Sequence, residues 1–237
     1  MKRTFIAVTT AVVIGFISAV GLCFRALFTP RTVVAVSELK IVIDAGHGGV
    51  DAGVLGRNTG LKESDVNLAV SYRLKDALED MGFAVTLTRK TDAGLYGAAT
   101  KGFKKRDMQK RKEIIEETNP ALVISVHQNF YPSKTTRGGQ VFYRKADEES
   151  HRLAACVQEN LNALYEAEGA KNRTEMAGEY FMLECWSCPS VIVECGFLSN
   201  SEDEALLGTE IWQTKLARSI AGGVLSYFGE GAVSMLS

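Results

Sequence analysis

The sequence predicts a single α/β domain, with a largely parallel, twisted sheet flanked by helices and preceded by a hydrophobic N-terminal helix. The chain has 237 residues, 46% of them hydrophobic and 23% charged, which is enough for one sizeable core. A strand, helix and strand follow one another over residues 40–88, an order typical of parallel sheets. An uncharged N-terminal stretch lies apart from this pattern. The domain is therefore expected to span residues 39–237.

The N-terminal segment, residues 1–25, has the length and composition of a membrane-spanning helix. Lys2 and Arg3 precede its uncharged part and Arg25 follows it. That part is long enough to cross a bilayer, and longer than the roughly 7–15 apolar residues of a typical secretory signal. We expect an uncleaved anchor that holds the body of the protein outside the cytoplasm. A cleaved signal peptide stays open as the alternative, and residues 26–38 form a linker in either case.

The first elements of the domain follow from hydrophobic periodicity. Residues 40–44 form a β-branched apolar run that ends in a glycine-rich loop, which predicts a buried strand. Residues 63–82 carry apolar side chains at helical spacing, and Gly82 supplies a stop. Residues 83–88 then return as a strand. Together these segments make a parallel strand–helix–strand unit.

The remaining elements are expected to continue this pattern. The stretch 92–105, rich in Gly, Ala and Lys, is predicted to be a mobile loop. Apolar spacing predicts the other elements, which are helices at 108–118, 148–168 and 211–228 and strands at 121–126, 139–143, 180–183 and 190–194.

The charge balance argues against a nucleic-acid partner. When Lys2, Arg3 and Arg25 of the leader are set aside, 24 of the 27 basic residues remain against 28 acidic ones. Proteins that hold nucleic acid present a basic field, which this composition does not supply. We therefore expect no nucleic-acid binding.

The five cysteines do not form a recognisable metal or disulfide pattern. Cys185 and Cys188 are spaced as C-x-x-C but lack the second ligand pair of a structural zinc site. Free thiols are the prediction. A bridge among Cys185, Cys188 and Cys195 stays open, because the domain is expected outside the cell.

Two of the three histidines occupy positions where α/β sheets bind ligands. His47 and His127 each follow the carboxyl end of a predicted strand, whereas His151 lies within a predicted helix among charged residues. His47 and His127 are therefore candidate ligands, and His151 is expected to be a surface residue.

Two glutamates could complete a site with these histidines. Hydrolytic zinc sites commonly use two histidines and one glutamate. Glu63 opens the helix after the His47 loop, where periodicity alone favours a helix-dipole acid over a ligand. Glu194 ends an apolar strand, where a carboxylate is costly unless metal, hydrogen bonds or substrate compensate it. That cost favours a functional role for Glu194.

Four motifs follow one another along the chain: IVIDAGHGG at 41–49, GLKESDVNL at 60–68, SVHQN at 125–129 and VECGFLSN at 193–200. In this order they resemble the motifs of the zinc-dependent N-acetylmuramoyl-L-alanine amidases of the AmiC-like family. The resemblance implies that Zn²⁺ is bound by His47, Glu63 and His127 and that Glu194 is the catalytic base. It also aligns Arg111 with a recurrent arginine of structural role. Gln128 and Cys195 depart mildly from the family pattern, without removing a ligand or the base.

The short chain and its leader look most like the germination-specific, CwlD-type branch of this family. That resemblance implies hydrolysis of the bond between the lactoyl group of muramic acid and L-alanine in spore cortex peptidoglycan, on the way to muramic-δ-lactam. The expected location is extracytoplasmic, in the spore envelope. Two alternatives stay open: a zinc peptidase acting on wall peptides, and an anchored peptidoglycan-binding protein whose activity depends on an activating protein partner.

Polar residues beside the candidate ligands are expected to orient them. Asp44 precedes the His47 loop and Asn129 follows His127. We predict that either Asp44 or Asn129 forms a hydrogen bond to a histidine ring, because residues around a metal site commonly orient its ligands in this way. A turn-forming role is the alternative for both.

Overall fold

Six strands form one mixed sheet at the centre of the domain. The computed structural model describes residues 39–98 and 101–234, with side chains through residue 229. The strand order is β2-β1-β3-β6-β4-β5, with β1, β2, β3 and β6 parallel and β4 antiparallel to β6. The strands are β1 (Lys40–Ala45), β2 (Ala84–Leu87), β3 (Leu122–Asn129), β4 (Gln140–Arg144), β5 (Met176–Gly178) and β6 (Ser190–Phe197).

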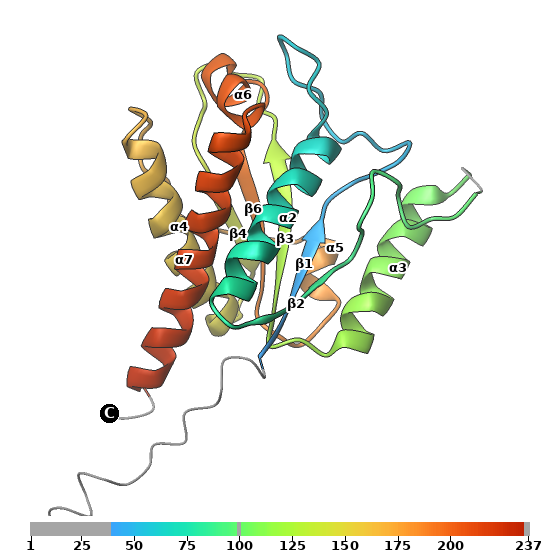
Figure 1. Cartoon of the computed structure of the whole chain (residues 1–237), viewed down its shortest axis with the longest axis vertical. Coiled ribbons are helices and arrows are strands. Elements are labelled where there is room, and N and C mark those ends of the chain that lie inside the picture. Colours follow the sequence, from blue (N-terminus) through green and yellow to red (C-terminus); the bar gives the residue numbers. More distant parts are fainter. Residues whose placement is uncertain (1–38, 99–100, 235–237) are drawn as a thin grey trace, which may run out of the picture. The chain divides into compact units, whose positions relative to one another are not determined.

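Helices cover both faces of this sheet (Figure 1). Helices α2, α4 and α7 lie together over one face, and α3 and α5 lie over the other. Helix α6 sits beyond the carboxyl end of β6. The helices are α2 (Glu63–Asp80), α3 (Phe103–Thr118), α4 (Glu148–Glu166), α5 (Phe181–Glu184), α6 (Ser201–Leu207) and α7 (Glu210–Ser234).

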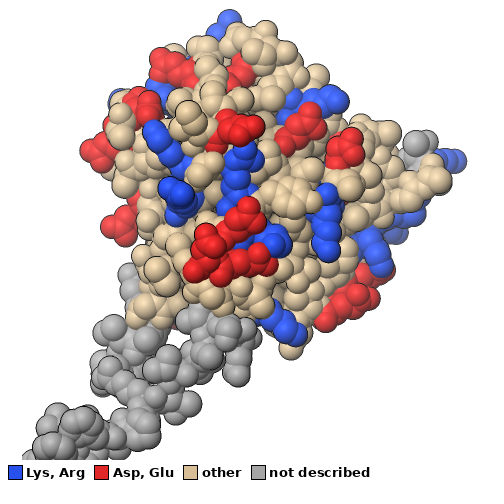
Figure 2. Space-filling model, in the orientation of Figure 1, with Lys and Arg blue, Asp and Glu red and all other residues tan. Residues whose placement is uncertain are grey.

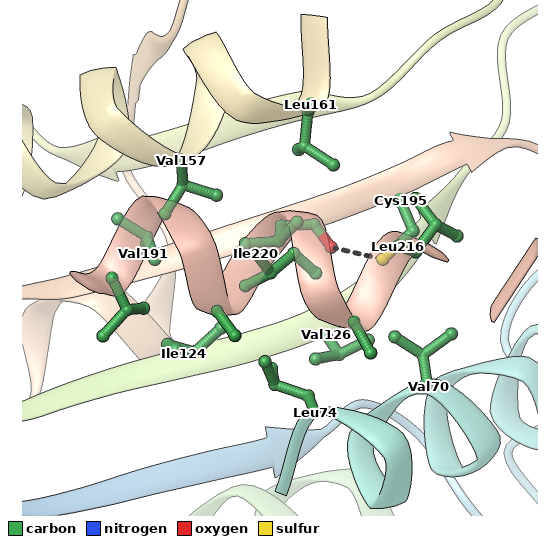
Figure 3. Close-up of a cluster of buried hydrophobic side chains, with 14 of the residues drawn as sticks. Val70, Leu74, Ile124, Val126, Val157, Leu161, Val191, Cys195, Leu216 and Ile220 are labelled. Atoms are coloured by element: carbon green, nitrogen blue, oxygen red, sulfur yellow. Dashed lines mark hydrogen bonds between the residues drawn. The ribbon is translucent and has the colours of Figure 1, made fainter. Parts of the chain in front are cut away.

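Strand alternation divides the core into two clusters. In β1, Ile41 and Ile43 pack toward α2, α4 and α7, whereas Val42 packs toward α3 and α5. Figure 3 shows the larger cluster, in which Leu216 and Ile220 of α7 lie between α4 and α2. Because side chains alternate along a strand, the residues in phase with Val42 share the α3–α5 face. That face carries the candidate site.

Acidic and basic groups are interspersed on the face covered by α2, α4 and α7 (Figure 2).

The four described cysteines are free thiols. Cys156 and Cys195 are buried, and Cys185 and Cys188 are partly buried. Burial raises the pKa of the Cys195 thiol to about 12. A thiol with so high a pKa is a weak nucleophile, so Cys195 serves as a small core residue.

The structure confirms a single α/β domain but corrects three sequence-based expectations. The sheet is mixed, because β4 is antiparallel to β6 and β5 is parallel to β4. Residues 180–183, predicted as a strand, contain the short helix α5, because Tyr180, Met182 and Leu183 do not alternate cleanly between two faces. The short elements β5 and α6 were not predicted.

The predicted anchor at residues 1–25 and linker at 26–38 lie outside the described residues. Within the described part of the chain, no helix is long and apolar enough to cross a bilayer.

Candidate metal centre

Three side chains from separate elements converge at the carboxyl edge of the sheet. His47 lies in the loop after β1, Glu63 is the first residue of α2, and His127 lies in β3. Glu63 Oε1 is 3.2 Å from His47 Nε2 and 3.0 Å from His127 Nδ1. One donor atom from each residue lies within 4.8 Å of the others. The structure thus brings together the three ligands expected from the sequence.

This donor set fits a zinc ion. Two imidazole nitrogens and one carboxylate oxygen are typical of hydrolytic zinc sites, which leave a fourth position for water or substrate. Ligands about 2 Å from a tetrahedral ion are about 3.3 Å apart, close to the two distances above. Glu63 is 2% exposed, and its Oε2 accepts a hydrogen bond from the backbone N–H of Val54 at 2.8 Å. The carboxylate is therefore held in place by the protein.

The electrostatics of Glu63 also suit a metal ligand. Burial alone would raise the pKa of Glu63, but hydrogen bonds and charge interactions with His127 and His47 outweigh burial and hold the pKa well below its usual range. The backbone N–H of Gln128 donates a further hydrogen bond to Oε1 at 3.1 Å. Glu63 is consequently ionised at neutral pH, as a zinc ligand must be.

Two buried arginines hold the backbone that presents His47. Arg111 on α3 donates hydrogen bonds to the carbonyls of Ala45 and His47, both at 2.6 Å. Arg89 donates to the carbonyls of Ala45 at 2.9 Å and Gly46 at 3.1 Å. His47 itself has φ 61°, a left-handed conformation that costs free energy in a non-glycine residue. The arginines thus stabilise a strained backbone at the ligand.

Gly46 lets the two ligand segments approach closely. A Cβ atom on this residue would lie 2.3 Å from His127 Cε1, much closer than two non-bonded carbon atoms can approach. Any larger residue at this position must therefore displace the His127 ring.

The two residues predicted to orient a histidine ring bind other groups. Asp44 accepts hydrogen bonds from Thr88, Ser125 and Arg111 at 2.6–2.7 Å, and Asn129 Oδ1 accepts one from the N–H of Phe130. Neither hydrogen bonds to a histidine ring within the described residues, so that prediction is corrected. Asp44 instead forms an ion pair with buried Arg111 and neutralises its charge.

Asp51 provides the ring contact that was expected of Asp44 or Asn129. Its Oδ2 lies 3.2 Å from His47 Nδ1, the nitrogen that faces away from Glu63. Burial lowers the pKa of His47, but Glu63 and Asp51 outweigh burial and raise it. The four-residue spacing from His47 to Asp51 was the only available signal in the sequence.

Asp51→Ala is expected to weaken zinc binding about 10- to 100-fold, because a ligand histidine then loses the carboxylate that fixes its ring. Competition titration against a chelator of known affinity measures the change. Asp76→Ala, at an exposed position on α2, is the matched control and should bind zinc like the wild type. Equal affinities for Asp51→Ala and wild type would contradict the assignment.

Glu194 faces the same site from the neighbouring strand. In the parallel pairing of β3 and β6, Glu194 stands opposite His127. Its Oε2 is buried and has no hydrogen-bond partner among the described residues. Burial raises the pKa of Glu194 to about 7, with Glu63 adding to the rise and the histidines opposing it. A buried, unpartnered carboxyl with a pKa near neutrality is suited to proton transfer.

Glu194 should also lower the stability of the metal-free protein as pH rises. Its pKa is higher in the folded protein than its usual 4.5, so between pH 4.5 and about 7 the unfolded chain loses the proton first and the free energy of unfolding falls. Glu194→Gln removes this loss of stability, because a glutamine side chain does not titrate. The chelator-treated variant should be about 1–3 kcal/mol more stable than wild type at pH 8, with a smaller difference at pH 5.

Urea denaturation of both proteins at the two pH values measures this difference. Glu175→Gln, a partly exposed glutamate paired with surface His151, is the control and should show little dependence on pH. A Glu194→Gln variant less stable than wild type at pH 8 would contradict the raised pKa.

Two cavities that share four lining residues open beside these side chains. One, of about 440 Å³, is lined by residues that include His47, Glu63, His127, Glu194 and Phe130. The other, of about 260 Å³, shares both histidines with the first and extends along the α3–α5 face. The site therefore has room for substrate on two sides of the candidate metal position.

Helix α6 supplies two positioning acids that the sequence did not reveal. Glu204 accepts hydrogen bonds from the backbone N–H groups of Asn58 and Thr59, at 2.9 and 2.7 Å. These residues belong to the loop that leads into Glu63. Asp203 accepts hydrogen bonds from the N–H groups of Gly138 and Phe197, at 2.8 and 3.0 Å. The acids resemble ordinary first-turn helix residues in sequence, so only their contacts reveal this role.

Comparisons with known proteins agree on one family. Residues 41–226 match the family described as N-acetylmuramoyl-L-alanine amidase. The germination-specific N-acetylmuramoyl-L-alanine amidase of Bacillus subtilis is 35% identical over 193 residues, covering 80% of each protein. The CwlD amidase of Clostridioides difficile, solved in complex with the GerS lipoprotein, is 35% identical, with a TM-score of 0.76, over 81% of this chain and 98% of that one.

A more distant structure has the same architecture. The amidase AmiC2 of Nostoc punctiforme is 32% identical, with a TM-score of 0.67, over 81% of this chain and 97% of that chain. The family match covers most of the domain and includes all four candidate site residues. The chain therefore belongs to the N-acetylmuramoyl-L-alanine amidase family.

Proposed function

We propose that this amidase hydrolyses the amide between the lactoyl group of muramic acid and L-alanine in peptidoglycan, with zinc bound by His47, Glu63 and His127. The observation that carries the proposal is the position of Glu194. Its buried Oε2 has no hydrogen-bond partner in the described part of the chain, and the residue lines the same cavity as the three donors, where it can reach a reacting water.

The protein residues divide the chemistry between them. A zinc ion in this site supplies a Lewis acid that activates water and polarises the substrate carbonyl. Glu194 accepts the proton of the attacking water and then donates it to the departing alanine nitrogen. Glu194 is buried beside the three donors and lines the same cavity, which places its carboxyl where it can transfer this proton. Asp51, Arg89 and Arg111 hold the His47 loop in place throughout.

The proposed setting is the spore envelope, with cortex peptidoglycan as the substrate. Support comes from the similarity to the germination-specific amidase of Bacillus subtilis and to the CwlD amidase of Clostridioides difficile. Residues 1–25 would then hold the domain outside the cytoplasm, as an anchor or as a signal, with 26–38 as the linker to the catalytic domain at 39–237. The peptide-free muramic acid produced is the group required for conversion to muramic-δ-lactam.

We further propose that full activity depends on an activating protein partner. The support is that the CwlD amidase of Clostridioides difficile was solved in complex with the GerS lipoprotein. Such a partner would act outside the cytoplasm, where the substrate lies.

The test is mass spectrometry of products from purified cortex fragments incubated with the zinc-loaded protein. The expected products are glycans with free lactoyl groups and peptides with an N-terminal alanine. His127→Ala should lose zinc and activity together, because two donors bind the ion far less tightly than three.

Other products would support the alternatives. Shortened peptides on intact muramoyl-alanine would indicate a zinc peptidase and reject the proposal. Binding without any hydrolysis, in the presence of zinc and of envelope proteins from sporulating cells, would indicate a peptidoglycan-binding protein. Hydrolysis that appears only with those proteins would support partner-dependent activity.

A further inference from the structure

One lysine lines both cavities of the candidate metal centre. Lys104 lies in the first turn of α3 and belongs to the walls of the 440 Å³ and the 260 Å³ cavity. His47, Asp51 and His127 are the other residues that the two cavities share. Lys104 is therefore placed where the two cavities join, beside the ligands.

The charges around Lys104 are already paired with one another. Asp51 contacts His47, and Asp107 binds Arg111 and the backbone N–H of Leu95. Arg111, the other basic side chain of these walls, is also bound to Asp44. Across the described residues Lys104 forms no ion pair and no hydrogen bond. It is thus a cation at the site that is available to a ligand.

Helix stability does not explain why a lysine occupies this position. The first turn of α3 contains Lys104, Lys105 and Arg106, and its described residues include no acid. Cations are unfavourable in a first helical turn, because the backbone already carries partial positive charge there. The helix dipole therefore does not favour a lysine at this position.

The smaller cavity has the character of a peptide subsite. Its wall away from the ligands is largely apolar and includes Tyr180, Phe181, Met182 and Ile192. Tyr180 and Phe181 are 43% and 49% exposed, so they offer apolar surface to a ligand. An alanine side chain fits such a wall, whereas a carboxylate requires a cation.

We propose that Lys104 binds the free carboxylate of the second stem-peptide residue, and so selects peptidoglycan in which that carboxylate is not amidated. The inference rests on the proposed function. With the scissile amide at the donor set, the second residue begins about one residue length, roughly 4 Å, beyond the alanine. Lys104 also lines the smaller, largely apolar cavity that this inference assigns to the peptide. Lys104 is a specificity-determining residue that takes no part in bond cleavage.

The experiment compares two otherwise identical muropeptides with the zinc-loaded full-length protein. In one the second peptide residue bears a free carboxylate, and in the other that group is an amide. Wild type should prefer the carboxylate form. Lys104→Met should lower kcat/KM for that form about 5- to 10-fold, mainly through KM, and leave the amide form within about twofold.

Two further variants separate charge from local structure. Lys104→Arg keeps the charge and should keep most of the preference. Lys105→Met removes a neighbouring first-turn lysine that lines neither cavity, and should behave as wild type on both substrates. Zinc content is measured for every variant and should not change.

Several results would overturn the inference. Equal losses on both muropeptides, or no loss on either, would show that Lys104 does not bind this carboxylate while leaving the proposed function standing. The same loss in Lys105→Met would assign the effect to the general charge of α3. A wild-type protein that cleaves neither muropeptide, with zinc and sporulation envelope proteins present, would reject the proposed function and this inference together.

Discussion

Glu194→Gln is expected to lower kcat by about 10²- to 10⁴-fold while zinc binding is retained. Glutamine keeps the size of the side chain but cannot accept the proton of the attacking water. Glu194 is not one of the three converging donors, so the metal site should persist. Steady-state hydrolysis of a defined muropeptide and metal analysis of the same sample measure the two quantities.

The control for this prediction is Glu175→Gln, the same chemical change at a glutamate paired with surface His151. It should retain wild-type kcat and zinc. Near-wild-type hydrolysis by Glu194→Gln would remove this residue from the proposed mechanism. Loss of zinc from that variant would instead make Glu194 a ligand.

Arg111→Met is expected to lower the free energy of unfolding by about 3–5 kcal/mol. Arg111 is 1% exposed and Asp44 is 1% exposed, so removing the cation leaves an uncompensated buried carboxylate. Burial alone would raise the pKa of Asp44, but Arg111, Thr88 and Ser125 hold it below its usual range. The variant also removes the hydrogen bonds to the carbonyls of Ala45 and His47.

Urea denaturation at pH 7 measures the loss, and Lys110→Met is the matched control. Lys110 is the preceding residue on α3, but its ion pair with Glu113 is exposed, and exposed pairs contribute little to stability. An Arg111→Met protein as stable as Lys110→Met would contradict the assigned role. Surviving Arg111→Met protein should also bind zinc more weakly, because the backbone at His47 is less constrained.

The parallel part of the sheet could be predicted from sequence because its strands contain uninterrupted runs of apolar residues. Residues 41–43 and 121–124 are continuous apolar runs, the pattern expected of strands that are buried on both faces. Glu194 was detectable for the same reason, since a carboxylate in such a run requires an explanation. The metal-ligand roles of His47, Glu63 and His127 came from the family motifs, because periodicity alone left Glu63 ambiguous.

The antiparallel edge and the supporting contacts could not be predicted. Local periodicity does not reveal strand direction, so the reversal of β4 against β6 was missed. Residues 180–183 are apolar enough for a strand, but the chain turns there into α5. Glu204 contacts Asn58 and Thr59, which precede it in the chain by 146 and 145 positions. Such contacts depend on tertiary structure. The contact of His47 with Asp51 rather than with Asp44 depends on it as well.

The strand that carries His127 depends on neighbours from distant parts of the chain for both of its edges. The strand that carries His127 lies between β1 and β6, and β6 begins only at Ser190. A nascent chain that ends before this strand exposes one edge of β3 and lacks Glu194. We therefore expect a fragment that ends before β6 to bind zinc more weakly than the whole domain, although it contains His47, Glu63 and His127.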